Sequence, residues 1–446
     1  MPNAFHTATC LPFGSPLYVM LKPVGARCNL SCDYCYYLSK LPAMQFPTLS
    51  EALLEDFTRQ YLEAQTTPQV LFTWHGGEPL LRPMSFYEKA LGLQRRYARG
   101  RQVDNCLQTN GTLLTDEWCR FLRDNHFLVG ISIDGPQWMH DHYRHSVVGH
   151  ASKHDNAGRQ SWHRVMRGIE LLEKHGVEWN AMATVNNVTA QAPQEFYHFF
   201  RDLGCQFLQF TPVVETLPAS VSVRPSASVS GSDTPCSSAP VSVPPSASVS
   251  GSHTPCSSVP ARGADVTVAP YSVSADAWGR FLCAVYDEWV RRDVGEIFVQ
   301  TFDATLANWV GEPPGVCSLS AMCGHAAVME TDGTVYSCDH FVFPEYRLGN
   351  IRQQPLTALV YGEQQRRFGR QKHDGLTDQC RQCQWLFACH GECPRNRFAR
   401  DCYGNPGHNY LCAGYRQFFA HVAADMDFMA AELQAGRPPA NIMSVK

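Results

Sequence analysis

"ARCNLSCDYCYY", residues 26–37, contains three cysteines, Cys28, Cys32 and Cys35, separated by three residues and then by two. A closed tetrahedral zinc site or a fully ligated iron–sulfur cluster takes four protein ligands. Three thiolates therefore leave one coordination position open, and an open position is where a substrate or a cofactor binds. The spacing by itself predicts reaction chemistry at a metal centre.

The composition of the chain sets the class of protein. Its 446 residues suffice for a barrel-sized domain and one or two smaller modules. The net charge of −4, without a block of Lys or Arg, argues against a nucleic-acid partner. The sequence has no run of about 18 apolar residues to span a membrane, and its start lacks a signal-peptide pattern. The 19 cysteines therefore indicate metal ligands rather than disulfides, and we expect a cytoplasmic metalloprotein.

Short β-like runs alternate with helix-like periods from residue 17 to residue 214. The strand candidates include "VLFTW", "LVGISID" and "FLQFTPVV", and a helical period follows each of the first five. This alternation predicts βαβ units and a parallel sheet. Six units are too few to close an eight-stranded barrel. We therefore expect an α/β fold, an open partial (β/α)6 barrel with its chemistry at the C-terminal ends of the strands.

The rest of the chain divides by composition. Residues 1–214 form the N-terminal part of the barrel, and residues 215–263 are a Ser/Pro-rich insertion in which a segment of 20 residues occurs twice. The insertion lacks large side chains for a core, which predicts a disordered loop without a catalytic role. The remaining parts are a barrel-closing helix and connector at 264–310, a Cys-rich module at 311–415, and a C-terminal helix and tail at 416–446.

The Cys-rich module contains nine cysteines. The stretch "METDGTVYSC" predicts a β-hairpin that turns at Asp332-Gly333 and delivers Cys338 on its return strand. CxxC pairs are also common in structural zinc modules, so spacing alone leaves both zinc and iron–sulfur open. The nine residues are Cys317, Cys323, Cys338, Cys380, Cys383, Cys389, Cys393, Cys402 and Cys412.

The N-terminal CxxxCxxC run resembles the signature of radical S-adenosylmethionine (SAM) enzymes. In that superfamily three cysteines hold a 4Fe–4S cluster, and SAM binds the fourth iron through its amino and carboxylate groups. The C-terminal spacing resembles the SPASM module, which carries two auxiliary clusters. Together with "GGEP", "QTNG", "SIDGP" and "GNPGHNYLCAGY", these motifs make the chain most similar to the anaerobic sulfatase-maturating enzymes. The resemblance implies a radical SAM partial barrel followed by a SPASM module, with SAM and three 4Fe–4S clusters as cofactors.

The resemblance also assigns eleven cysteines to clusters. Those of the SAM cluster are Cys28, Cys32 and Cys35. Those of the first auxiliary cluster are Cys317, Cys323, Cys338 and Cys393. Those of the second are Cys380, Cys383, Cys389 and Cys412. Cys402 is an extra thiol that we expect to be structural or unligated.

Two further motifs match positions that contact SAM in the family. Gly76, Gly77 and Glu78, in "WHGGEP", are expected at the SAM amino group, because glycines let the backbone approach a ligand closely. Ser132 and Arg144 match the positions that hold the SAM ribose and carboxylate. The forked guanidinium of arginine suits a carboxylate.

Three residues are expected on the substrate side, Tyr37, His75 and Asp339. Tyr37 and His75 match positions beside the peptide substrate, although His75 stands where relatives often have Gln. Asp339, directly after Cys338, matches the position of the base that accepts the substrate proton, and a carboxylate beside a cluster ligand is well placed for that transfer. His340 is a second possible base, but it has no matching role in the family.

The implied activity is oxidation of a Cys or Ser side chain of a sulfatase to Cα-formylglycine under anaerobic conditions. A radical formed from SAM removes hydrogen from the substrate Cβ, and a proton and an electron follow. The expected partners are the sulfatase polypeptide and a flavodoxin- or ferredoxin-type electron donor, with no nucleic acid and no membrane.

Two alternatives remain open from the sequence. A radical SAM/SPASM maturase of a ribosomally made peptide would use the same clusters, but only about sixteen residues precede the first strand, too few for a peptide-recognition domain. A non-catalytic metal-binding scaffold would need a fourth protein ligand to close the three-Cys loop.

Overall fold

The computed structural model of the protein describes residues 17–38, 48–147, 160–217 and 266–446. The Ser/Pro-rich repeat lies outside these residues, so the prediction of a disordered loop stays untested. The residues on either side of it meet, because the Leu217 amide donates to the Thr267 carbonyl at 2.8 Å and Ala269 donates to Glu215 at the same distance. The insertion therefore begins and ends at one place.

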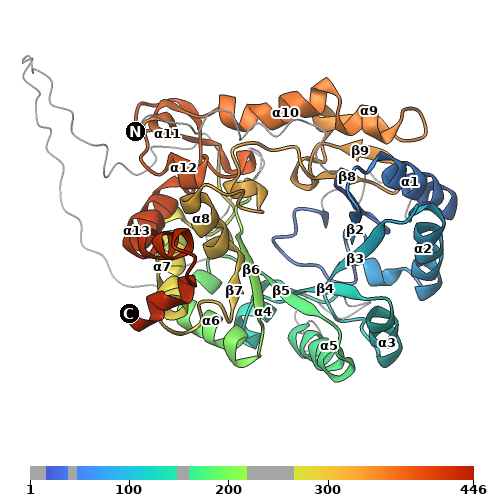
Figure 1. The fold of residues 1–446 in the computed structure, drawn as a ribbon, viewed down its shortest axis with the longest axis horizontal. Helices are drawn as coiled ribbons and strands as arrows, with labels where there is room; N and C mark the ends of the chain where they lie inside the picture. The colour runs from blue at the N-terminus through green and yellow to red at the C-terminus, as the bar shows by residue number, and fades with distance from the viewer. Residues whose placement is uncertain (1–16, 39–47, 148–159, 218–265) are drawn as a thin grey trace, which may run out of the picture.

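One sheet organises the described residues, with the strand order β10-β9-β8-β1-β2-β3-β4-β5-β6-β7. Strands β1 to β7 are parallel, and they curve as an open partial barrel (Figure 1). This arrangement confirms the α/β partial barrel predicted from the alternating pattern. The first seven strands are β1 (Val19–Leu21), β2 (Gln69–Trp74), β3 (Gln102–Thr109), β4 (Phe127–Ser132), β5 (Trp179–Val185), β6 (Phe207–Pro212) and β7 (Phe298–Val299).

Helices connect the strands and cover the outside of the barrel (Figure 1). Their ends follow the sequence signals: Ser50 caps the first helix and Thr115 the third with their side chains, and Gly176, in a left-handed conformation, ends the fifth. The sequence did not predict the fourth helix, which is short. The barrel helices are α1 (Glu51–Ala64), α2 (Met84–Tyr97), α3 (Asp116–Asp124), α4 (Gln137–Tyr143), α5 (Trp162–His175) and α6 (Pro193–Asp202).

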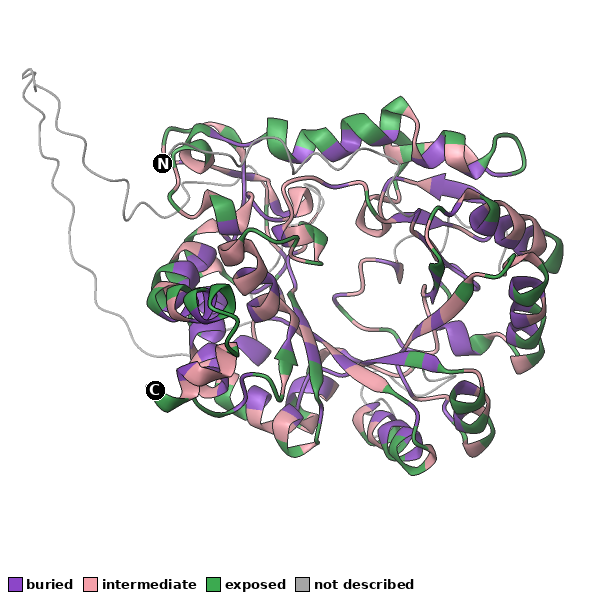
Figure 2. Ribbon diagram, viewed as in Figure 1, coloured by how far each residue is buried: buried purple, intermediate pink, exposed green. Residues whose placement is uncertain are grey.

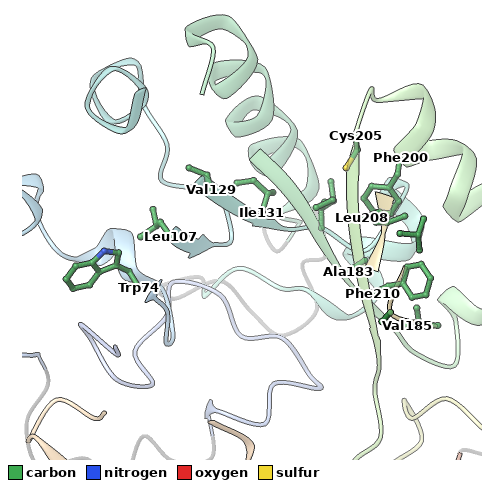
Figure 3. Close-up of a cluster of buried hydrophobic side chains, with 14 of the residues drawn as sticks. Trp74, Leu107, Val129, Ile131, Ala183, Val185, Phe200, Cys205, Leu208 and Phe210 are labelled. Carbon is green, nitrogen blue, oxygen red and sulfur yellow. The ribbon is translucent and has the colours of Figure 1, made fainter. Parts of the chain in front are cut away.

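The main core lies between the sheet and these helices. Figure 3 shows Val129 and Ile131, alternate residues of β4, on the same side of the sheet, and both are buried. On β6, Phe210 packs edge-on against Phe196 of α6 and Phe281 of the later helix α7 (Ala275–Arg292). Buried residues gather on the sheet and on the inward helix faces, while exposed residues occupy the outer faces (Figure 2). None of the helices in the described ranges is long and apolar enough to cross a membrane.

The predicted hairpin of the Cys-rich module is present. Strands β8 (Ala327–Met329) and β9 (Thr334–Tyr336) are antiparallel, and Gly333 has a φ of +85° in the turn between them. The sequence did not show that β8 pairs in parallel with β1, which makes the hairpin a continuation of the barrel sheet. The short strand β10 (Arg347–Asn350) pairs with β9 at the edge. Because β1 and β8 run in parallel, the turn that follows β8 lies beside the loop that follows β1.

Two long helices close the other side of the barrel, α7 (Ala275–Arg292) and α13 (Cys412–Gln434) (Figure 1). They cross at Gly279 and Gly414, where a Cβ on Gly414 would overlap the Ala275 carbonyl oxygen. This close approach fixes the start of α13, where Cys412 lies. The module between them contains α8 (Gln300–Val310), α9 (Leu356–Val360), α10 (Glu363–Asp374), α11 (Asp378–Arg381), α12 (Leu386–Cys389) and the hairpin β11 (Ala399–Arg400) and β12 (Pro406–His408).

Candidate active site

The three-Cys loop follows β1, at the C-terminal end of the parallel strands. The Cys35 amide donates to the Cys32 carbonyl at 3.0 Å, and the Cys28 sulfur accepts from the Leu30 amide at 3.3 Å and from Asn110 Nδ2 at 3.6 Å. Burial, followed by the charge of Glu78, raises the pKa of Cys28 to about 11, and burial raises that of Cys32 to about 12; the neighbouring thiols contribute to both values. Three thiolates are stable together here only when a cation neutralises them.

The Gly-Gly-Glu motif at the end of β2 packs directly against this loop. The Gly77 amide donates to the Gly25 carbonyl at 2.7 Å, and the Glu78 amide donates to the Arg27 carbonyl at 2.8 Å. A Cβ on Gly77 would overlap the Arg27 carbonyl oxygen, so only glycine fits. The Glu78 carboxylate accepts from the Asn110 amide at 2.8 Å. The motif thereby joins the three-Cys loop to the ends of β2 and β3.

The structure places Ser132 and Arg144 near the same strand ends. Ser132 Oγ accepts from Gln108 Nε2 at 3.0 Å. Arg144, which is buried, donates through Nε and Nη2 to the two carboxylate oxygens of Asp134 at 2.8 and 3.0 Å. The forked donors that we expected for the SAM carboxylate thus contact Asp134, and an Arg144–SAM contact stays a prediction. Our prediction did not include Asp134, although "SIDGP" contains it.

A group of charged and polar residues surrounds Asp339 beside the three-Cys loop. The buried Lys22 places Nζ 2.5 Å from Asp339 Oδ1 and 3.0 Å from His75 Nδ1, and the Tyr36 hydroxyl donates to Asp339. Burial opposes ionisation of Asp339, but the Lys22 ammonium, with His75 and His340, outweighs burial and holds the pKa of that carboxyl well below its usual range. Asp339 is therefore an anion in a fixed orientation.

His75 and Tyr37 lie on either side of Lys22. Burial, followed by the Lys22 charge, lowers the pKa of His75 to about 3, so its imidazole is neutral. Lys22 Nζ lies 4.4 Å from the centroid of the Tyr37 ring, and the Tyr37 hydroxyl donates to Glu330. The structure thus brings together the residues predicted on the substrate side, Tyr37, His75 and Asp339.

The sequence did not identify Lys22, Tyr36 or Arg395 as parts of this group. Arg395 lies 4.9 Å from the Tyr36 ring centroid and donates to both carboxylate oxygens of Glu215, at 2.5 and 2.6 Å. His340 makes an edge contact with the Tyr36 ring. Tyr36 is within the stretch that contains the three cysteines, and Lys22 lies four residues before that stretch. Their link to Asp339 depends on the pairing of β1 with β8, which no sequence pattern reveals.

The first predicted auxiliary set comes together from distant parts of the chain. Burial above all raises the pKa of Cys338 to about 12, and the neighbouring thiols of Cys317 and Cys323 contribute to this rise. Burial raises the pKa of Cys393 well above its ordinary value, and Cys323 and Cys317 add to this rise. Cys317 and Cys323 are therefore within electrostatic reach of both Cys338 and Cys393.

The second set lies next to the first. Burial raises the pKa of Cys412 well above its ordinary value, and the neighbouring thiols of Cys389, Cys380 and Cys383 contribute. The four line a cavity of about 500 Å³ together with Cys402, whose amide donates to Gln379 Oε1 at 2.9 Å. The intervening residues His390, Gly391 and Glu392 all have positive φ, a tight turn that directs Cys389 and Cys393 to different sets.

These three sets fit clusters better than single ions. Within the described ranges, no three His, Cys, Asp or Glu side chains are placed to hold one metal ion. The thiols of each set nevertheless raise one another's pKa, so they surround a common space. A 4Fe–4S cluster has one iron for each ligand and needs such a space. The donor sets therefore suit two closed clusters and one that keeps an iron open.

Comparison with known proteins identifies the two parts of the chain. Residues 23–200 match the radical SAM superfamily, and residues 317–384 match an iron–sulfur cluster-binding domain known as SPASM. The chain is 52% identical to a serine-type anaerobic sulfatase-maturating enzyme of Bacteroides thetaiotaomicron, over 98% of this chain and 96% of that protein. It is 35% identical to a serine-type enzyme of Klebsiella aerogenes, over 92% of this chain and 86% of that one.

Solved structures give the same result. The structure of anSMEcpe with bound AdoMet and Cp18Cys peptide is 26% identical, covers 94% of this chain and 99% of its own, and has a TM-score of 0.73. Streptococcus suis SuiB shares the fold alone, at 11% identity and a TM-score of 0.52. With a relative 52% identical along almost its whole length and the donor sets of both cluster-binding parts in place, the chain belongs to the anaerobic sulfatase-maturating enzymes of the radical SAM superfamily.

Proposed function

We propose that this radical SAM maturase oxidises a serine side chain of a sulfatase polypeptide to Cα-formylglycine and accepts cysteine less readily. The identities support this order of preference. The relatives named serine-type share 52, 35 and 34% of residues with the chain, whereas those named cysteine-type share 26, 27 and 28%. The solved relative with a bound peptide supports a polypeptide substrate.

The cofactors are SAM and 4Fe–4S clusters, as in the family. When bound, they supply one-electron cleavage of SAM and the hydrogen abstraction that follows. We assign Cys28, Cys32 and Cys35 to the SAM cluster, because among the residues that the structure describes no fourth thiol acts on Cys28 or Cys32. The two sets of four thiols in the SPASM module are assigned to the auxiliary clusters.

The observation that carries the proposal is the ionised Asp339 beside the three-Cys loop. Oxidation of a CH₂–OH group to an aldehyde removes one hydrogen atom, one proton and one electron, so the site needs a base. Lys22 and Tyr36 hold the Asp339 carboxylate by an ion pair of 2.5 Å and a hydrogen bond. In this proposal Asp339 accepts the hydroxyl proton of a serine substrate or the thiol proton of a cysteine substrate. His75 and Tyr37 are proposed to contact the substrate.

The electron donor and the compartment are also proposals. A flavodoxin- or ferredoxin-type protein matches the single electron that each cleavage of SAM consumes. The reducing cytoplasm keeps thiols free of disulfides, so it suits a protein that uses many cysteines as metal ligands.

The test uses anaerobically reconstituted full-length protein, SAM, a chemical reductant and two sulfatase-derived peptides that differ only in Ser or Cys at the target position. We expect loss of two hydrogens from the Ser peptide, an aldehyde that reacts with a hydrazide, and slower conversion of the Cys peptide. Cleavage of SAM with no aldehyde in either peptide would overturn the proposed function. Faster conversion of the Cys peptide would overturn only the preference.

A further inference from the structure

One face of helix α10 holds the segments that carry the first auxiliary set. Gln365, Gly369 and Lys372 follow one another at intervals of four and three residues, so they share a face. Gln365 Nε2 donates to the carbonyls of Gly324 and Ser337, each at 3.0 Å. These two residues are the immediate neighbours of Cys323 and Cys338.

The same face of α10 also contacts Cys323 directly and holds the segment of Cys317. The Cys323 amide donates to the Gly369 carbonyl at 3.2 Å. Lys372 is fully buried, and its Nζ donates to the Cys317 carbonyl at 2.6 Å and to the Ser318 carbonyl at 2.7 Å. Helix α10 therefore positions three of the four cysteines, and it does so with one neutral side chain and one cation.

Lys372 is the unusual residue on this face of α10. A buried ammonium is costly unless negative charge compensates it. In the described part of the chain no carboxylate lies within ion-pair distance of Lys372, whose ammonium donates to carbonyl oxygens. Its two hydrogen bonds go to the carbonyl of the assigned ligand Cys317 and to that of the next residue, so the ammonium lies beside the first auxiliary set. The thiolate-bound cluster therefore supplies negative charge that compensates it.

We propose that Lys372 raises the reduction potential of the first auxiliary cluster through its buried positive charge. Reduction adds a negative charge to a cluster, and net charge near the cluster and hydrogen bonds around it set the potential. A fixed ammonium that is hydrogen-bonded to the segment carrying Cys317 stabilises the reduced form of the cluster. The proposal rests on the assignment of these four thiols to a cluster.

Other charges near the set are arranged differently. Glu392 is buried and accepts from Asn409 at 2.7 Å and Asn396 at 3.1 Å, and burial raises its pKa while Lys372 opposes that rise. Arg397 Nη1 donates to the Lys372 carbonyl at 2.5 Å, and its charge reaches Cys323 as well as Cys380 of the second set. Lys372 is thus the cation directed at the first set, while Arg397 lies between the two.

The experiment uses the full-length chain with Cys28, Cys32 and Cys35 replaced by Ala, so that only the auxiliary clusters contribute to the signal. The midpoint potential of each cluster is measured by anaerobic redox titration followed by electron paramagnetic resonance, with iron counted in every sample. For Lys372→Met we expect the reduction equilibrium constant of the first cluster to fall at least tenfold, which is about 59 mV toward more negative potential for one electron. Lys372→Arg keeps the charge and is expected to stay close to the unsubstituted chain.

Two controls separate charge from scaffolding. Gln365→Met removes two contacts to the same segments without changing charge, and we expect a smaller shift than for Lys372→Met. Arg416→Met removes a cation whose charge acts on Cys412, and we expect it to shift the second cluster and leave the first. Equal shifts for Gln365→Met and Lys372→Met, or an unchanged potential in Lys372→Met, would overturn the role of Lys372.

Iron content keeps the result interpretable. If Lys372→Met fails to retain the first cluster, Lys372→Gln, which is neutral but can still donate to a carbonyl, replaces it under the same criterion. If the parent with three alanines holds far fewer than about eight irons, the cluster assignment and the proposed function fail, independently of Lys372.

Discussion

Lys22 connects three parts of the site by a single buried charge. It follows β1 directly, and its ammonium contacts Asp339 and His75 and lies against the Tyr37 ring. Removal of one partner from a buried ion pair leaves the other charge uncompensated, which costs about 3–5 kcal/mol. Lys22 therefore stabilises the junction between β1 and β8 and fixes the orientation of the carboxylate assigned as base.

At this scale the first prediction concerns Asp339. Asp339→Asn preserves the shape of the side chain and removes its capacity to accept a proton. We expect the variant to form 5′-deoxyadenosine and to produce little or no formylglycine on a sulfatase-derived peptide, measured by mass spectrometry. Asp276→Asn, at an exposed ion pair with Arg280, is the control and should behave as wild type. Formylglycine formation near the wild-type level in Asp339→Asn would show that another group takes the proton.

The second prediction concerns the three-Cys loop. Cys32→Ala should abolish SAM cleavage and lower the iron content from about twelve to about eight per chain, because the auxiliary sets use other thiols. Cys106→Ala, in β3, is the matched control: its thiol is not assigned to any set, so iron and cleavage should be unchanged. Production of 5′-deoxyadenosine by Cys32→Ala would contradict the assignment of this loop to the SAM cluster.

At the scale of elements, the close crossing of α7 and α13 depends on glycine. A Cβ on Gly414 would meet backbone atoms of α7. The two helices would have to move apart, and Cys412 at the start of α13 would be displaced. We expect Gly414→Ala to lower the free energy of unfolding by about 1–3 kcal/mol, as overpacking in a core does. The measurement is thermal unfolding of the reconstituted protein. Gly92→Ala, in α2 where an added Cβ meets nothing within 4 Å, should instead leave stability unchanged or raise it slightly.

The Ser/Pro-rich insertion gives a second prediction for an element. Glu215 and Leu217, at its start, already form hydrogen bonds with Ala269 and Thr267, which follow it. A short linker in place of residues 218–265 should therefore close without strain, and loop length itself changes stability by only about 0.6 kcal/mol per doubling. We expect folding and formylglycine production of the deletion variant to match the full-length chain. Loss of activity in a well-folded deletion variant would give the repeat a function in recognition.

At the scale of the whole molecule, one sheet extends from the barrel into the Cys-rich part. Because β8 pairs with β1, the site lies where the two parts meet, between the three-Cys loop and the residues after Cys338. The two parts nevertheless differ in what stabilises them. The barrel has a large apolar core of strands and helices, whereas the segment from residue 311 to residue 411 has mostly short elements and seven of the eleven assigned cluster ligands.

The prediction at this scale concerns metal removal. Thiolate ligands that a buried site brings together couple metal binding to folding. We expect the iron-free protein to keep the barrel and to lose order between residues 311 and 411, so that limited proteolysis cuts there first. Anaerobic reconstitution with iron and sulfide should restore resistance. Equal proteolysis of both parts in the iron-free protein would show that the clusters do not stabilise the C-terminal part.

The sequence by itself determined much of this protein. The alternating pattern predicted the βα units because parallel strands and amphipathic helices have distinct periods, and the cap residues Ser50 and Thr115 placed two helix starts correctly. Cysteine spacing and the resemblance that it carries predicted the three sets of thiols, since ligand spacing is local within each motif.

The tertiary structure decided the contacts between residues that are far apart in the chain. Only the pairing of β1 with β8 brings Lys22 next to Asp339, and only the fold brings Cys393 beside Cys317. The ion pair between Arg144 and Asp134 likewise depends on where α4 lies at the strand ends. The orientation of α10, with Lys372 against the segment that carries Cys317, belongs to the same class. Such contacts arise from packing of whole elements, and a periodic pattern within one element contains no information about its neighbour.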